Sequence, residues 1–353
     1  MGNHTCMSDF TYVMRAVFPV RANGVAAMNL FTQKQYKKWL KLGRAIEKPL
    51  FYPDLAVINK IMSLVKAGGY VIVYPEGQVT AHAVTDKNIG GVAKLAKHLK
   101  CNVYTFRTEN AWNVDPLWYK GGKRKGTSRS VLDICLSKEQ LENLTVAETE
   151  AKIYEKLRVT DEDIINNKLE VSCDNAADGL EVYLYKCCRC FENTMKSESG
   201  WIYCTACGNS VKLTKTGRLA ADDGCFSPPT IHLYNEIIIA KEKEQLKETS
   251  FAVTLKMKGG NGPMGVETVG KGEVVFSKDG VTYSGAKNGE TVNLRFDKRL
   301  KYPSDISKNF QIYEKNEWYE FWCDNATDNS RAVIIGELFY QYKMSATRGD
   351  IML

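Results

Sequence analysis

Two short blocks in the first quarter of the chain carry side chains suited to acid–base chemistry. His4 and Asp9 stand near the start with four residues between them, and Glu76 and Gly77 follow a Tyr-Pro pair later in the chain. Histidine can take a proton near neutral pH, and a neighbouring carboxylate fixes its tautomer and supports its charged form. The pair therefore suits acyl transfer, in which an alcohol must lose a proton when it attacks a thioester carbonyl.

Two predicted elements should position these residues. Five positions apart on one helix the two side chains would diverge, so His4 is expected in a loop and Asp9 in the first turn of a helix. Residues 69–74 are continuously apolar, which predicts a buried parallel strand that ends at Pro75. Open α/β sheets bind substrates just beyond such strand ends, and Gly77 would let the backbone approach a ligand closely. The alternatives are an ordinary strand-to-loop turn and a histidine without a catalytic role.

Four blocks of the sequence resemble, in order, the motifs of the 1-acylglycerol-3-phosphate acyltransferases and their glycerolipid acyltransferase relatives. The resemblance covers about residues 1–135 and rests on residues 3–9, 42–48, 74–79 and 87–99 with the apolar segment 101–106. In the first block, the family's Asn-His-x-Ser-x-x-Asp, Cys6 stands where serine is usual. In the third, Gln78 and Val79 replace the last two residues of Phe-Pro-Glu-Gly-Thr-Arg. One block alone would not be specific, but four in the family's order are.

The resemblance implies an α/β domain in which each matched residue has a role. His4 would be the general base that takes the proton from the acceptor hydroxyl, and Asp9 would orient it. Glu76 and Gly77 would lie against the glycerol-phosphate end of the acceptor, and Lys48 near its phosphate. The implied substrates are a lysophospholipid and an acyl thioester of coenzyme A or acyl carrier protein, which makes that carrier a further candidate partner.

Two departures from the family pattern bear on activity. Val79 cannot supply the charge-assisted phosphate contact that the family's arginine would give. The chain would then either rely on Lys48 and another cation or accept a lysolipid whose headgroup presents no bare phosphate monoester. We favour the first alternative, because Arg44, Lys48 and Arg107 are all near matched blocks that should face the same site. The family also has a strand before the histidine block, whereas three residues precede His4, so the domain is expected to start short or incomplete. Both departures favour the alternative of a catalytically degenerate scaffold that serves membrane or partner attachment.

A second set of residues has metal-ligand spacing. The chain holds two Cys-x2-Cys pairs separated by thirteen residues: Cys187, Cys190, Cys204 and Cys207. Two such turns facing each other supply four tetrahedral thiolates, which predicts a ribbon with a structural Zn²⁺; disulfides and unliganded thiols are the alternatives. Lys196 is the only basic residue in the hairpin 191–203, so phosphate contact is not expected there. A zinc-dependent nucleic-acid binder is therefore the third interpretation.

The length of 353 residues exceeds what one hydrophobic core normally serves, so several domains are expected. The predicted order is an α/β acyltransferase-like domain (1–135), a helical connector (136–180), the zinc ribbon (181–215), a helix (226–250) and a β-rich domain (251–353). We expect the last to contain strands at 251–257, 272–284, 291–296, 310–313 and 318–323, hairpin turns at 278–280 and 288–289, and a closing helix at 332–342. This outline resembles a pleckstrin-homology or GRAM-like domain.

Charge and hydropathy indicate a cytoplasmic protein with peripheral membrane contact. No apolar run approaches the roughly 18 residues that span a bilayer, and scattered single cysteines are typical of a reducing compartment. A net charge of +7 suits anionic phospholipid or nucleic acid, although such an excess also occurs in proteins that bind neither. Residues 31–44 combine Phe31, Trp39 and Leu40 with five basic residues, the pattern of a helix in a membrane interface. A helix whose aromatic side is core is the alternative.

Overall fold

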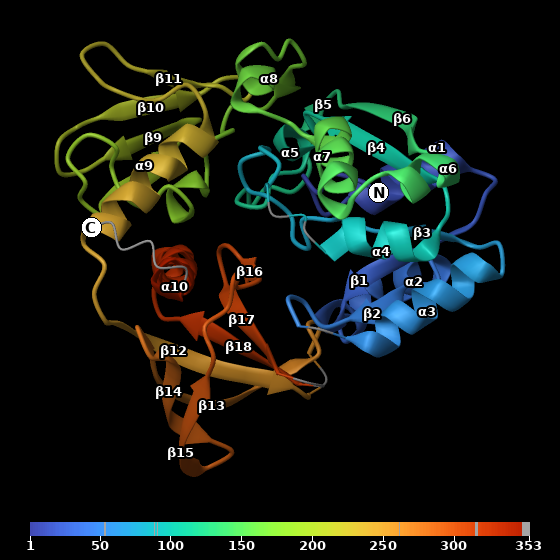
Figure 1. The fold of residues 1–353 in the computed structure, drawn as a ribbon. Helices are drawn as coiled ribbons and strands as arrows, with labels where there is room; N and C mark the ends of the chain where they lie inside the picture. The colour runs from blue at the N-terminus through green and yellow to red at the C-terminus, as the bar shows by residue number, and fades with distance from the viewer. Residues whose placement is uncertain (53, 88, 90, 261, 315–316, 348–353) are drawn as a thin grey trace.

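The computed structural model describes residues 1–52, 54–87, 89, 91–260, 262–314 and 317–347. It has an N-terminal layered part, a small sheet beside helix α9 (Ile231–Glu244), and a large antiparallel sheet with helix α10 (Ala326–Thr347) (Figure 1). The predicted mixed α/β class and the β-rich C-terminal part are confirmed at this level. Within the described residues, no helix has both the length and the apolar character needed to cross a bilayer.

The N-terminal part is built from short strands covered by helices. Its helices are α1 (Asp9–Val17), η1 (Met28–Phe31), α2 (Lys34–Leu42), α3 (Leu55–Lys66), α4 (Gly91–Leu99) and α5 (Ala111–Val114). Its strands are β1 (Ala22–Ala27), β2 (Ile46–Lys48), β3 (Tyr70–Ile72), β4 (Val103–Glu109), β5 (Lys125–Gly126) and β6 (Arg129–Leu136). β1 lies between β2 and β3 and is parallel to both, whereas β6 pairs with β4 in antiparallel orientation.

Residues 1–3 connect the two halves of this sheet by lying between β3 and β4. The Gly2 N–H donates to the Val73 carbonyl (3.1 Å), and the Phe106 N–H donates to the carbonyl of the first residue (2.8 Å). Gly2 and Phe106 form a parallel bridge. Extended backbone thus occupies the position expected for a strand before His4. Because these strands run in parallel, His4 leaves the sheet at the same edge as the residues that follow β3.

The connector consists of helices that begin at polar caps. It contains α6 (Lys138–Asn143), α7 (Val146–Leu157), α8 (Asp161–Ile165), β7 (Val171–Ser172) and η2 (Leu180–Val182). The side chains of Ser137, Thr145 and Thr160 each accept a hydrogen bond from the backbone three residues later, and that third residue's side chain bonds back to the cap. Such capping boxes satisfy the free N–H groups of a first turn and so fix where the helices start. Ile153 of α7 then packs with Val103 of β4.

The small sheet and α9 share one core with a loop of the N-terminal part. The strands are β8 (Met195–Glu198), β9 (Trp201–Cys204), β10 (Ser210–Leu213) and β11 (Leu219–Ala221), in the antiparallel order β11-β10-β9-β8. Ala83, in the loop after Gly77, is fully buried. It belongs to the same apolar cluster as Ile202 of β9, Tyr234 of α9 and Leu338 of α10. Segments far apart in the sequence therefore enclose that loop.

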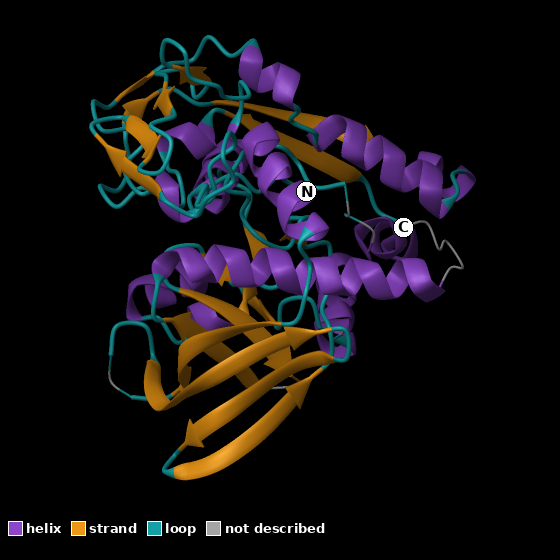
Figure 2. Cartoon of the chain, turned by 90° about the vertical axis from the view of Figure 1, so that its left-hand side faces the viewer, coloured by secondary structure: helices purple, strands orange, loops and turns teal. Residues whose placement is uncertain are grey.

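The C-terminal part is a seven-stranded antiparallel sheet packed against α10. Its strands are β12 (Thr249–Lys258), β13 (Val266–Ser277), β14 (Gly280–Lys287), β15 (Glu290–Phe296), β16 (Ser304–Asp305), β17 (Asn309–Glu314) and β18 (Glu317–Cys323). Their order across the sheet is β15-β14-β13-β12-β18-β17-β16, and Figure 2 shows α10 lying along it. The predicted turn at 278–280 is present, and it divides the segment 272–284, predicted as one strand, between β13 and β14. The helix predicted at 332–342 is longer, since polar residues flank the apolar run that indicated it.

Candidate functional site

His4 and Asp9 meet at the entrance of α1. His4 follows the extended residues 1–3, and Asp9 is the first residue of the helix. The Nδ1 atom of His4 lies 3.1 Å from Oδ2 of Asp9. A hydrogen bond to this carboxylate requires the imidazole proton on Nδ1, which leaves Nε2 as the acceptor. The structure brings the two side chains together in the loop and first helical turn; their catalytic roles stay predictions.

The Asp9 carboxylate is held by donors from the preceding loop, among them a long contact from the Thr5 hydroxyl to Oδ1 (3.5 Å). Oδ2 accepts hydrogen bonds from the N–H groups of Thr5 (2.6 Å) and Cys6 (3.0 Å), and Oδ1 accepts one from the Cys6 thiol (3.2 Å). Asp9 is 1% exposed, so these donors replace water around the carboxylate. Burial, with Asp9 beside it, raises the pKa of the Cys6 thiol well above its ordinary value. The thiol therefore stays protonated and donates to the carboxylate as a serine hydroxyl could.

Glu76 is tied to the histidine loop through the backbone. Its Oε1 accepts a hydrogen bond from the His4 N–H (2.8 Å), and its Oε2 accepts one from the Asp86 N–H (3.2 Å). The Thr80 N–H donates to the His4 carbonyl (2.9 Å). Glu76 is only 5% exposed, and burial raises its pKa to about 8 although both N–H donors act in the opposite direction. The loop after β3 therefore holds the His4 backbone through both its N–H and its carbonyl.

The His4 ring lies against Tyr74. The two ring centroids are 4.3 Å apart and the ring planes are inclined by 21°, which is a stacked arrangement. Burial raises the pKa of the Tyr74 hydroxyl well above its ordinary value, so this wall of the site is neutral. Within the described part of the chain, neither the Tyr74 hydroxyl nor His4 Nε2 has a hydrogen-bond partner. A hydrogen-bonding ligand would therefore find an available acceptor on the imidazole.

Gly77 and Lys48 are linked by the loop between β2 and α3. Gly77 has a φ of +76°, which glycine adopts without strain. A Cβ at this position would lie 3.2 Å from the Phe51 ring, so the Gly77 backbone packs closely on that loop. The Lys48 ammonium donates to the carbonyls of Pro49 (3.1 Å) and Tyr52 (3.2 Å), and burial lowers its pKa. Lys48 thus closes its own turn, and phosphate binding by it stays a prediction.

The convergence of Arg44, Lys48 and Arg107 on one phosphate stays a prediction, and the contacts of Arg107 do not favour it. Arg44 precedes β2 and Lys48 ends it, so the two residues stand at opposite ends of that strand. The Arg107 guanidinium pairs with Glu109 (3.0 Å) and Asp163 (3.2 Å), which neutralise its charge. Side chains alternate between the two faces of a strand, and closeness to a motif does not decide which face a residue takes.

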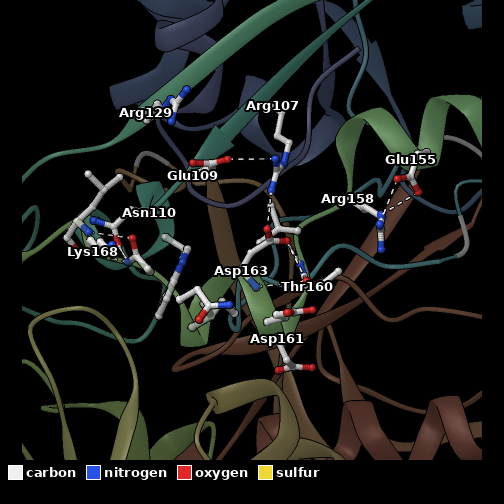
Figure 3. Close-up of a pocket in the computed structure, with 17 residues that line it drawn as sticks. Arg107, Glu109, Asn110, Arg129, Glu155, Arg158, Thr160, Asp161, Asp163 and Lys168 are labelled. Carbon is white, nitrogen blue, oxygen red and sulfur yellow. Dashed lines mark hydrogen bonds and ion pairs between the residues drawn. The ribbon is translucent and has the colours of Figure 1, made fainter.

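A polar cavity of about 850 Å³ lies beyond the carboxyl end of β4 (Figure 3). Arg107 and Glu109 line it together with Arg129 of β6 and connector residues between 155 and 169. Figure 3 shows Arg107 between Glu109 and Asp163, to both of which it is paired. His4 is not among the described residues that line the cavity, so the cavity is separate from the histidine site. No local pattern of residues predicts the cavity, because its walls come from separate segments.

The four predicted zinc ligands come together at one end of the small sheet, in the turn before β8 and at the turn that joins β9 to β10. The Sγ atoms of Cys187 and Cys207 are 3.7 Å apart, and those of Cys190 and Cys204 are 3.6 Å apart. All four ligand atoms lie within 4.8 Å of one another. Tetrahedral zinc with Zn–S bonds of ~2.3 Å needs sulfurs about 3.8 Å apart, so the cluster fits the ion. These four cysteines could hold a metal such as zinc, and among the residues described no other His, Cys, Asp or Glu cluster has this geometry.

Two tight turns direct the sulfurs inward. The carbonyl of the first cysteine in each pair accepts a hydrogen bond from the residue four positions later, Phe191 or Gly208 (both 3.0 Å). Cys188 is not part of the cluster, because its thiol donates to the Phe226 carbonyl (3.3 Å). Four thiolates complete a tetrahedral shell and leave no position for a substrate, so the metal would stabilise structure.

No protein-family model, curated protein or solved structure matches the chain. The structure shows a mixed α/β fold, a large antiparallel sheet and a four-cysteine cluster that could hold a metal. The acyltransferase resemblance accordingly rests on the four sequence blocks alone.

Proposed function

We propose that the chain is an acyltransferase that moves a fatty acyl group from an acyl thioester, of coenzyme A or acyl carrier protein, to a hydroxyl of a lysophospholipid. The observation that carries this proposal is the 3.1 Å contact between His4 Nδ1 and Asp9 Oδ2. Because Asp9 is buried and two N–H groups fix its carboxylate, it can orient the imidazole and support the protonated form. Nε2 is then the atom that takes a proton.

The reaction would proceed by direct attack of the acceptor on the thioester. His4 Nε2 takes the proton of the acceptor hydroxyl while the hydroxyl oxygen bonds to the carbonyl carbon. The carbonyl oxygen becomes an oxyanion, the C–S bond then breaks, and the departing sulfur receives the proton from His4. The products are an ester and a thiol, and His4 returns to its neutral form.

The glycerol-phosphate end of the acceptor would lie along the loop that contains Glu76, Gly77 and Val79. This loop also donates the hydrogen bond to the His4 carbonyl, so it runs next to the base. Lys48 is the cation we assign to the phosphate, because its turn packs on Gly77. Its ammonium would exchange a local carbonyl for the phosphate, a stronger acceptor because it is charged.

The remaining parts would serve the same reaction. The four cysteines would hold a structural Zn²⁺ and so stabilise the core that encloses the loop after Gly77. The C-terminal part would be a pleckstrin-homology or GRAM-like domain, since seven antiparallel strands are followed by one helix that packs on them. The protein would act in the cytoplasm at a membrane surface, where lysophospholipids reside.

The proposal is tested by incubating the purified chain with labelled acyl thioesters of both carriers and a panel of lysophospholipids. We expect labelled diacyl product from the wild type and none from His4→Ala. His98→Ala is the matched control, because His98 is an exposed histidine on α4. A folded wild-type chain that yields no product with any donor and acceptor would overturn the proposal and favour the catalytically degenerate scaffold.

A further inference from the structure

Helix α2 presents three parallel stripes of side chains. Tyr36 and Leu40, four residues apart, are half-buried and face the body of the protein. Trp39 and Leu42, three residues apart, form a second stripe and are 60% and 64% exposed. The third stripe consists of exposed lysines at helical spacing: Lys34, Lys37, Lys38 and Lys41. Two exposed apolar side chains thus lie beside a row of cations.

The described part of the chain leaves this surface open. None of Lys37, Lys38 and Lys41 forms a salt bridge with a described residue. Figure 1 shows α2 with α3 on the outer side of the N-terminal part, away from strands β9 to β11. The interpretation of the aromatic side as core is wrong for Trp39, because more than half of that side chain contacts solvent. Neighbouring exposed tryptophan and leucine side chains mark a surface that binds something apolar.

The start of α2 is fixed to the C-terminal part. The Lys34 N–H donates to the Pro263 carbonyl (3.0 Å), and the Thr32 hydroxyl donates to the Met264 carbonyl (3.1 Å). Because β1 is parallel to β3 and leads into η1 and α2, the helix begins at the sheet edge where His4 lies. A ligand surface that binds α2 would therefore keep a constant orientation relative to the sheet edge where His4 lies.

We infer that α2 is a membrane-docking helix for bilayers that contain anionic lipid. Trp39 and Leu42 enter the headgroup region, while Lys37, Lys38 and Lys41 contact lipid phosphates with their aliphatic stems along the apolar surface. Charge complementarity selects an anionic bilayer over a neutral one. Nucleic acid fits this surface less well, because duplex phosphates offer no apolar partner to the leucine. This inference adds a membrane-binding surface to the proposed acyltransferase. The observations that carry it come from α2 and do not depend on the chemistry at His4.

Flotation of the full chain with lipid vesicles tests the inference. Vesicles of phosphatidylcholine are compared with phosphatidylcholine vesicles containing one third phosphatidylglycerol, at low and high salt. We expect the chain to float only with the anionic vesicles and to be released by salt, which screens the lysines. Lys37→Gln/Lys38→Gln/Lys41→Gln should bind on the order of a hundredfold more weakly, because each lysine contributes about fivefold near an anionic surface. The affinity of Trp39→Ser/Leu42→Ser for anionic vesicles should fall by at least about tenfold.

Matched variants separate this surface from general charge and hydrophobicity. Lys60→Gln/Lys138→Gln/Lys247→Gln removes three exposed lysines elsewhere, and Leu55→Ser removes a leucine that is 75% exposed on α3. Both should bind anionic vesicles like the wild type. Equal losses in the lysine control, or wild-type binding by Trp39→Ser/Leu42→Ser, would overturn the assignment to α2.

Two further arms distinguish lipid binding from nucleic-acid binding and from catalysis. Binding of a DNA duplex without binding of vesicles would overturn the docking helix in favour of nucleic acid. His4→Ala should float like the wild type, so a failure of the acyl-transfer proposal leaves this result unchanged. Conversely, acyl transfer to micellar lysophospholipid by a chain that binds no vesicles would overturn the docking helix and leave the enzyme proposal standing.

Discussion

The ammonium of Lys301 lies 3.0 Å from the Asp86 carboxylate and joins the C-terminal part to the loop after β3. The same ammonium lies 3.2 Å from Glu337 of α10. Burial would lower the pKa of Lys301, yet the two carboxylates raise it above its ordinary value. Because the Asp86 N–H donates to Glu76, this ion pair supports the carboxyl group that holds the histidine backbone.

We expect Lys301→Met to loosen the loop 77–87 more than the rest of the chain. The free energy of unfolding should fall by about 1–3 kcal/mol, the range for losing a charge-assisted contact, and amides of the loop should exchange hydrogen faster. Lys301→Arg should restore the slow exchange. Glu337→Gln is the control, since it removes the lysine's other partner and should leave exchange in the loop near wild type. Slow exchange in Lys301→Met would show that the pair does not hold the loop.

His4→Ala should lower kcat for acyl transfer by about a hundredfold to ten-thousandfold, the usual contribution of a general base. Asp9→Asn should lower kcat by a smaller but still large factor. Its amide keeps one oxygen as an acceptor but cannot support a charged imidazole. Both variants should keep the fold and metal content of the wild type, checked by circular dichroism and metal analysis. Near-normal turnover in His4→Ala would exclude His4 as the base.

Ionisation of Glu76 should lower the free energy of unfolding of the chain as pH rises. Its pKa of about 8 in the folded chain lies above the ordinary 4.5, because burial disfavours the charged form. Between these two pKa values the folded state keeps a proton that the unfolded state releases. The stabilisation is therefore complete below the unfolded pKa of 4.5 and is lost as pH rises through the folded pKa of about 8. Glu76→Gln cannot titrate, so it should gain stability relative to the wild type between about pH 5 and about pH 9 in denaturant unfolding. A constant difference between the two proteins would contradict the raised pKa.

Metal analysis should find one zinc per chain, and Cys204→Ser should lose it. Cys188→Ser is the control and should retain the metal, because the Cys188 thiol bonds to a carbonyl outside the cluster. Loss of zinc should lower Tm, since the free energy of binding a structural metal is free energy of folding. A wild-type chain that is well folded and metal-free would refute the site.

Val79→Arg tests which acceptor headgroup the loop reads. If a phosphate monoester lies along this loop, a new arginine should raise kcat/KM for lysophosphatidic acid selectively over a lysophosphatidyl diester. The gain should be on the order of 1–3 kcal/mol in transition-state free energy, as expected of a charge-assisted contact. Val79→Gln controls for side-chain size without charge. Equal effects of arginine on both acceptors would show that position 79 does not contact the phosphate.

The features that the sequence predicts correctly are those that depend on neighbouring residues. An apolar run ended by Pro75 predicts the parallel strand β3, but the observed strand is shorter, and the predicted burial is wrong for Tyr70, which is 55% exposed. The Cys-x2-Cys spacing predicts the metal cluster, because each turn is set by a few consecutive residues. The hairpin turn predicted at 278–280 is likewise present and separates β13 from β14, whereas the predicted strand bounds 272–284 run across it.

The directions of long side chains and the contacts between distant segments could not be predicted. Lys48 follows the expected block, but the turn after β2 supplies carbonyls that take its ammonium. Arg107 lies near a matched block, yet packing of the connector brings Asp163 to it. Such contacts depend on how separate elements pack, and a single sequence contains no local signal for that arrangement.

The burial of Ala83 has a consequence for how the chain can be divided. The predicted boundary of the first domain lies near residue 135, but the loop after Gly77 is covered by β9, α9 and α10. Expressed alone, this segment would expose the apolar loop that follows Gly77. A transplant of residues 1–135 into another protein would therefore need the small sheet, α9 and α10, or a substitute for them, to cover that loop.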